Sequence, residues 1–137
     1  MIEIANIAKV SAWEQFANIS SRLGYLENAL NVHTAQRDSA LNAYMSAKYR
    51  AFKFTFDKNQ QRDEKEYQEA VSEKNLSWDR VSRLELIVSD LEMTIIIQSR
   101  EKAEAEELFF TAYRKWSDLK YFHSAPLLAS ALLLRLG

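Results

Sequence analysis

The residues of this chain that could support catalysis or metal binding are few and far apart. His33 and His123 are the only histidines, and cysteine is absent. A tetrahedral zinc site takes its ligands mainly from cysteine and histidine, so none can be assembled here. Neither histidine has a glutamate three residues before it, as the Glu-x-x-His pattern of di-iron helical bundles requires. We therefore predict no metal, no cofactor and no catalytic residue.

An acidic run and the glycine count complete the chemical inventory. Residues 101–107 read Glu-Lys-Ala-Glu-Ala-Glu-Glu, which could attract a cation but is typical of a solvated helix face. Glycine occurs only at positions 24 and 137, whereas phosphate-binding loops, dinucleotide fingerprints and nucleophile elbows all need glycine in their turns. We predict that the protein is not an enzyme.

Long helices are the elements that must position these residues. Residues 25 to 125 contain neither glycine nor proline, which most often mark turns and strand ends. The predicted fold class is all-α: an extended antiparallel helical hairpin, coiled-coil-like, with a short C-terminal helix. We expect a single elongated helical domain over residues 1–137, with helices at about 3–55 and 64–121, a turn at 57–63 and a short apolar tail helix at 126–136.

Two boundaries leave alternatives open. Gly24 costs a helix interior about 1 kcal/mol relative to alanine, so the first helix could break there and leave a short N-terminal helix. The segment 57–63 is polar throughout, and Asp63 with Glu66 has the spacing of a capping box. We favour a turn there over one unbroken helix, because a helix that long would need a partner along its full length.

Apolar residues recur at alternating steps of three and four, the spacing of a coiled-coil seam. In the first helix the seam comprises Phe16, Ile19, Leu23, Leu26, Leu30, His33, Arg37, Ala40, Tyr44, Ala47, Ala51 and Phe54. In the second helix it comprises Tyr67, Val71, Lys74, Trp78, Val81, Leu84, Val88, Leu91 and Ile95. Consecutive three-residue steps after Trp78 predict a stammer, which overwinds a coiled coil locally.

Folding the chain back near residues 57–62 sets a register between the two seams. The facing pairs would then be Tyr44 with Lys74, Ala40 with Trp78, and Arg37 with Val81. His33 and Arg37, the polar residues of the first seam, would come near Glu85. A partly buried polar contact can fix register while adding little net stability, so we interpret His33, Arg37 and Glu85 as register-setting residues.

Residues 84–97 have more apolar side chains than one seam can use. They read LELIVSDLEMTIII, and the seam takes only Leu84, Val88, Leu91 and Ile95. A helix that is apolar around more than half its girth needs more than one neighbour, which could be the N-terminal helix, a second copy or another protein. The residues that we predict to bind a partner here are Leu86, Ile87, Met93, Ile96 and Ile97.

The tail is a second candidate surface. Pro126 should end or kink the preceding helix and suits the first turn of a new one. Burying the six leucines of residues 127–136 would contribute on the order of 10 kcal/mol, so they should fold back on the hairpin, or dock on a partner or a membrane. The leucines predicted to bind a partner are Leu127, Leu128, Leu132, Leu133 and Leu134.

Charge and length limit the partners and the compartment. A net charge of −1 argues against binding to nucleic acid or to anionic membranes in general. The apolar tail is too short for an integral span, which needs about 20 residues, although peripheral membrane contact stays open. The lack of cysteine is compatible with a cytoplasmic protein, which is what we predict.

In length and heptad pattern over residues 16–120, the chain resembles the small coiled-coil stalk proteins of bacterial flagellar and type III export systems. It resembles less closely a fragment of a BAR-type membrane-curvature module, although its near-neutral charge departs from the basic concave face of those modules. Neither family offers a motif that matches residue by residue, so no site residue is carried over. We predict a non-enzymatic structural or adaptor protein of a larger complex, acting through helix–helix contacts with a protein partner or as a homodimer. The alternative is a membrane-surface, BAR-like helical module that dimerises.

Overall fold

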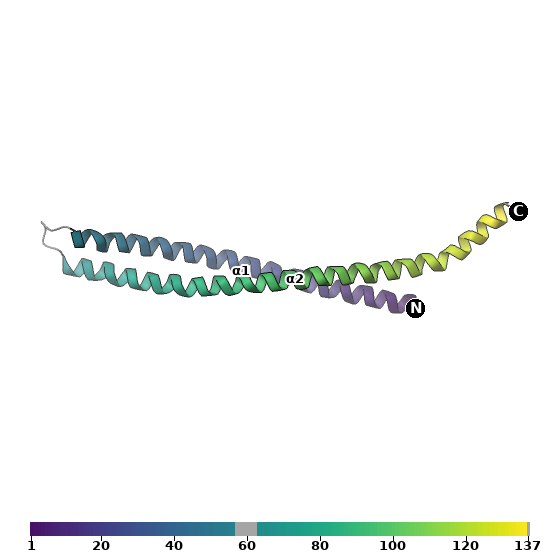
Figure 1. The fold of residues 1–137 in the computed structure, drawn as a ribbon, viewed down its shortest axis with the longest axis horizontal. Helices are drawn as coiled ribbons and strands as arrows, with labels where there is room; N and C mark the ends of the chain where they lie inside the picture. Colours follow the sequence, from purple (N-terminus) through teal and green to yellow (C-terminus); the bar gives the residue numbers. More distant parts are fainter. Residues whose placement is uncertain (57–62, 137) are drawn as a thin grey trace. The chain divides into compact units, whose positions relative to one another are not determined.

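The computed structural model contains two long helices that pack against each other as an antiparallel hairpin, α1 (Ile2–Phe56) and α2 (Glu64–Leu136) (Figure 1). It describes the backbone of residues 1–56 and 63–136, and the side chains of residues 1–54 and 63–121. The predicted all-α helical hairpin is confirmed. The predicted turn at 57–63 lies outside the described residues except for Asp63.

Asp63 caps the N-terminus of α2, as its sequence context predicts. The backbone N–H groups of Lys65 and Glu66 donate to the Asp63 carboxylate oxygen Oδ1, at 3.0 and 3.3 Å. The N–H of Tyr67 donates to the Asp63 carbonyl at 3.0 Å and begins the helical ladder. These bonds satisfy donors that a helix leaves unpaired in its first turn, so α2 begins at a defined residue.

Neither helix breaks where the sequence suggested. A separate N-terminal helix is not formed, because α1 runs through Gly24. The cost of about 1 kcal/mol for glycine relative to alanine does not break a helix of 55 residues. The prediction of a separate tail helix is wrong, because α2 runs through Pro126 to Leu136. An interior proline removes one backbone hydrogen bond and its ring crowds the carbonyl of the preceding turn, at about 3 kcal/mol, but the leucines and alanines around it are strong helix formers.

The hairpin divides into two compact units, each built from one stretch of α1 and one of α2. We call residues 25–95 the turn unit. We call residues 1–24 together with 96–137 the terminal unit. The single domain predicted from the sequence stays a prediction, and each unit is described by itself below.

The turn unit pairs its helices through small residues. Its buried residues are Ala40, Ala47, Ala51, Ala70, Val81, Leu84 and Val88. Ala47 is 0% exposed, and Ala40 forms a buried cluster with Val81 and Leu84. Alanines let two helix backbones approach closely, and aromatic pairs close the gaps beside them: the rings of Tyr44 and Trp78 are 4.9 Å apart.

The first predicted seam is confirmed residue by residue, because every member from Phe16 to Phe54 is buried or partly buried. The second seam needs a correction. Ala70 is buried and Ser77 is partly buried, whereas Trp78 is 50% exposed. The α2 seam therefore keeps an unbroken alternation of three and four through residues 70, 74, 77 and 81, and the predicted stammer does not occur. A small polar serine fits between closely packed helices where the large indole does not.

The predicted register also needs a correction, by about one helical turn. The ring of Tyr44 packs against that of Trp78, whereas Lys74 was expected to face Tyr44, and Ala40 is clustered with Val81 and Leu84, whereas Trp78 was expected to face Ala40. Arg37, which the predicted register paired with Val81, forms an ion pair with Glu85, and its proximity to Glu85 was also predicted. The shift brings small residues of one seam beside large residues of the other, a fit that spacing along a single helix does not reveal.

The terminal unit pairs its helices through aromatic rings. Ala5, Leu23 and Ala105 are its buried residues. Around them the Trp13 ring lies 5.7 Å from Phe16 and 5.2 Å from Phe109. Two lysines add cation–π contacts: Lys9 Nζ lies 3.5 Å from the Trp116 ring centroid, and Lys102 Nζ lies 5.8 Å from that of Phe16. The aromatics of this unit act as helix-pairing groups.

Candidate protein-interaction surface

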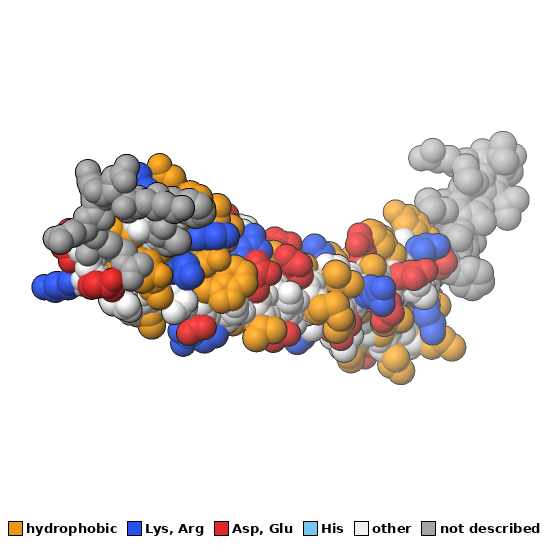
Figure 2. Space-filling view, turned by 60° about the vertical axis from the view of Figure 1, so that its left-hand side comes forward, with side chains coloured by type: hydrophobic (Ala, Val, Ile, Leu, Met, Phe, Trp, Pro, Cys, Tyr) orange, Lys and Arg blue, Asp and Glu red, His pale blue; other side chains and the backbone are white. Residues whose placement is uncertain are grey.

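Many large apolar side chains of the described residues are exposed, and most of the residues buried between the helices are alanines. Six of the ten buried apolar residues are alanines, and no large side chain is fully buried among the described residues. Twenty-two large apolar residues of the described chain are exposed. Single exposed apolar residues are ordinary, whereas a set this large marks candidate interaction surfaces. Figure 2 shows hydrophobic side chains reaching the surface between charged ones.

The five partner-binding residues predicted in the second helix are all exposed. Leu86, Ile87 and Met93 belong to the turn unit, and Ile96 and Ile97 to the terminal unit. That they bind a partner stays a prediction. The five predicted tail leucines lie in the helical backbone of α2, and their side chains fall outside the described residues.

The structure adds a row of apolar residues on α1 that the sequence reasoning missed. Leu41, Met45 and Phe52 are all exposed in the turn unit, and Tyr49 lies beside them. Residues four and eleven positions apart fall on one side of a helix, so Leu41, Met45 and Phe52 form a single row. The signal was present in this spacing, but the stronger seam pattern beside it dominated the sequence interpretation.

Leu41, one end of this α1 row, meets α2 at a groove in the turn unit. Leu41 lines the groove from α1, and Trp78, Val81 and Leu86 line it from α2. Ser82, Ser89 and Glu85 complete its wall. The small Ser82 between Trp78 and Leu86 leaves a hollow into which an apolar side chain of a neighbouring helix could pack. We call Leu41, Met45, Phe52, Trp78, Ser82 and Leu86 the groove face.

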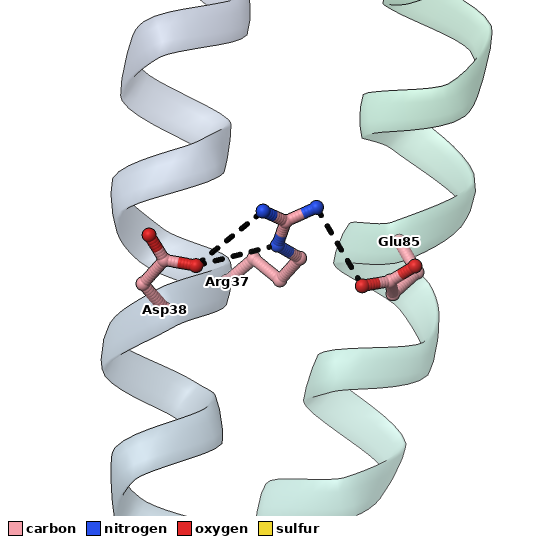
Figure 3. A network of polar contacts seen from close by, with 3 residues as sticks. All are labelled: Arg37, Asp38 and Glu85. Carbon is pink, nitrogen blue, oxygen red and sulfur yellow. Dashed lines mark hydrogen bonds and ion pairs between the residues drawn. The ribbon is translucent and has the colours of Figure 1, made fainter.

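An ion pair borders the groove face. Figure 3 shows the Arg37 guanidinium reaching from α1 toward Glu85 on α2, with Asp38 on its other side. Arg37 Nη1 lies 3.6 Å from Glu85 Oε1, and Arg37 Nε and Nη2 each lie 3.4 Å from Asp38 Oδ1. Because Arg37 is 26% exposed and Glu85 57%, the pair is largely solvated and its net stabilisation is well under 1 kcal/mol.

The three predicted register-setting residues are only partly brought together. Arg37 and Glu85 contact each other, as expected. His33 instead lies with Nδ1 2.7 Å from the carbonyl oxygen of Ala29 in its own helix, so an N–H at Nδ1 donates to that carbonyl. A second ion pair of the turn unit, between Arg50 and Glu73, was not predicted. That these contacts set the register stays a prediction.

No family model, curated protein or solved structure matches this chain. Within residues 1–54 and 63–121, no three or more histidine, aspartate or glutamate side chains gather as metal ligands would. In the same described part of the chain, neither helix has a stretch that is both apolar and long enough to cross a bilayer.

Proposed function

We propose that this protein is a non-enzymatic structural or adaptor protein of the cytoplasm, which acts through helix–helix contacts within a larger complex. One observation carries the proposal: six of the ten buried apolar residues are alanines, whereas twenty-two large apolar side chains of the described residues are exposed. Burying a large apolar side chain contributes about 1.5–3 kcal/mol, so further helices that cover these rows would gain much of the stabilisation that the pair forgoes. Such helices can come from a protein partner or from another copy of the chain.

The test is the state of the protein in its native cells. An affinity-tagged chain, purified under mild conditions, should elute in a complex of constant stoichiometry and of mass above 15.9 kDa. Replacing Leu86, Ile87 and Met93 together by glutamate should disrupt this complex while the far-ultraviolet circular dichroism stays helical, because all three side chains are exposed. The matched control replaces three exposed polar residues of α2, Ser72, Asn75 and Thr94, by glutamate.

Two results would contradict the proposal. One is a chain that stays monomeric both in extracts and when pure, with full helicity and reversible unfolding. The other is a complex that the triple glutamate variant and its control disrupt equally, since the apolar surface would then not be responsible. Deletion of residues 126–137 tests the tail in the same assay, and loss of the complex with retained helicity would assign the tail to the partner.

The membrane-surface alternative makes a different prediction. A BAR-like module should sediment with anionic liposomes at low salt, because attraction to such membranes depends on basic residues. The net charge of −1 and the mixed charges of the surface in Figure 2 do not favour it. A chain that stays in the supernatant at low salt would contradict this alternative and leave the helix-contact proposal intact.

A further inference from the structure

We propose that a second copy of this chain covers the groove face, so that two turn units pack face to face as a four-helix bundle. The inference rests on the proposed function and names its partner. It concerns the turn unit alone, where both helices contribute to one continuous face. Leu41 from α1 and Trp78 with Leu86 from α2 line the same groove.

The exposed area of the groove face matches what a dimer needs. Leu41, Met45, Phe52, Trp78 and Leu86 are between about two-fifths and two-thirds exposed. With large side chains of up to about 150–250 Å² each, they leave roughly 500 Å² of apolar surface in water. Two copies would therefore bury roughly 1,000 Å² from these residues alone, the threshold for a specific interface, and their neighbours would add more.

The shape of the groove face suits a symmetric pair. Its α1 half is a row of large side chains, whereas its α2 half holds Ser82 between Trp78 and Leu86. In a dimer with twofold symmetry the same patch is used twice, so one half must fit the other. A twofold axis parallel to the helices places α1 of one copy along α2 of the other. It also keeps equivalent residues of the two copies at the same position along the bundle axis. Leu41 of each copy then meets Ser82 of the other.

Charge and helix direction agree with this arrangement. A net charge of −1 per chain produces little repulsion between copies. Of the residues that line the groove, Glu85 alone is charged, and Arg37 already pairs with it. Because α1 and α2 are antiparallel, laying α1 along α2 of the other copy makes every neighbouring pair of helices antiparallel. That is the favourable alignment of helix dipoles.

The first experiment measures the solution mass of the purified full chain by light scattering over a range of concentrations. We expect twice 15.9 kDa for the wild type. We expect Leu86→Glu to weaken dimerisation by about 100-fold, because each dimer buries the charge twice. The matched control is Leu76→Glu, since Leu76 is 65% exposed against 69% for Leu86 but does not line the groove. Circular dichroism of both variants checks that the hairpin stays folded.

The second experiment places a single spin label on α2, which is straightforward because the chain has no cysteine of its own. Labels at Ser72→Cys and Arg83→Cys, both exposed, report the distance between copies at two heights of the turn unit. A parallel twofold axis predicts similar distances at the two sites. Inverted copies with a twofold axis across the groove at Ser82 would offset the two Ser72→Cys labels by about 30 Å along the bundle and the two Arg83→Cys labels by only about 3 Å. A markedly longer distance at position 72 than at position 83 would therefore overturn the proposed arrangement.

The remaining outcomes separate this inference from the proposed function. A wild-type chain that is monomeric when pure, yet part of a complex in native extracts, would overturn the second copy and keep the adaptor proposal. A dimer that Leu76→Glu disrupts and Leu86→Glu does not would place the interface elsewhere and overturn the inference. A chain that is monomeric when pure and also in extracts would contradict both.

Discussion

The turn unit and the terminal unit pair the same two helices in different ways. In the turn unit seven buried residues, four of them alanines, form a close seam with ion pairs at its edges. In the terminal unit only Ala5, Leu23 and Ala105 are buried, and partly exposed aromatic rings with lysine side chains fill the contact. One heptad pattern thus supports a close alanine seam in one unit and an aromatic contact with more exposed side chains in the other. The difference predicts which substitutions change the stability of each unit most.

The largest expected effect is in the alanine seam. Ala47→Glu would bury an unpaired carboxylate at a position that is 0% exposed, and should lower the free energy of unfolding by about 3 kcal/mol or more. The measurement is urea unfolding by circular dichroism, with peptide-resolved hydrogen exchange to show that the turn unit loses protection first. Ala43→Glu, one turn away and exposed, is the control. Equal losses for the two variants would mean that the seam is not where the structure places it.

An effect of opposite sign is expected in the terminal unit. Gln98 lies in the α2 seam, and its buried Oε1 has no hydrogen-bond partner among the described residues. Gln98→Leu should therefore raise the free energy of unfolding by about 1 kcal/mol, because an unsatisfied buried acceptor is replaced by an apolar group. The exposed Gln15 of the same unit supplies the control, Gln15→Leu, which should change stability much less. Destabilisation by Gln98→Leu would show that this amide is well paired.

The lysine–tryptophan contact of the terminal unit should have a smaller effect on the free energy of unfolding. Lys9→Met keeps most of the side-chain length but removes the charge from above the Trp116 ring, and should cost about 0.5–1 kcal/mol. Lys120 is the matched control, since its Nζ lies 5.0 Å from the same ring centroid against 3.5 Å for Lys9. Lys120→Met should have the smaller effect in the same unfolding assay. The reverse order would contradict the geometry of the pairing at Trp116.

The smallest effect is expected at the edge of the turn unit. A double-mutant cycle of Arg37→Met and Glu85→Gln should give a coupling of about 0.3 kcal/mol that fades in 1 M salt, because both groups are partly solvated. A coupling above 2 kcal/mol, or one insensitive to salt, would indicate a far more desolvated pair. Spin-label distances across the hairpin in Arg37→Met would also test the register role, which requires that they change.

The helices and most of their contact positions could be read from the sequence, because period and turn residues depend on local physics. The α1 seam from Phe16 to Phe54 followed from alternating steps of three and four, and the cap at Asp63 from its distance to Glu66. The helix break predicted at Pro126 was wrong, and the break left open at Gly24 does not occur. A local penalty does not by itself end a long helix whose formation is cooperative.

The contacts between helices were harder to predict, because they depend on how two surfaces fit. Reasoning from hydrophobicity assigned Trp78 to the seam, whereas the close approach of two alanine-rich helices favours Ser77 there. The same fit moved the register by about one turn. The groove face was missed because it exists only once Leu41 of one helix stands beside Trp78 and Leu86 of the other.

The most direct test of the central claim, that the large apolar residues outside the helix pair are covered in the assembled protein, is the concentration dependence of thermal unfolding. The midpoint of the pure chain should be followed by circular dichroism over a hundredfold range of protein concentration. If two copies cover each other, the midpoint rises with concentration, because association stabilises the folded state by mass action. A midpoint that stays constant for a chain of monomeric mass, together with a chain that is also monomeric in native extracts, would contradict the account.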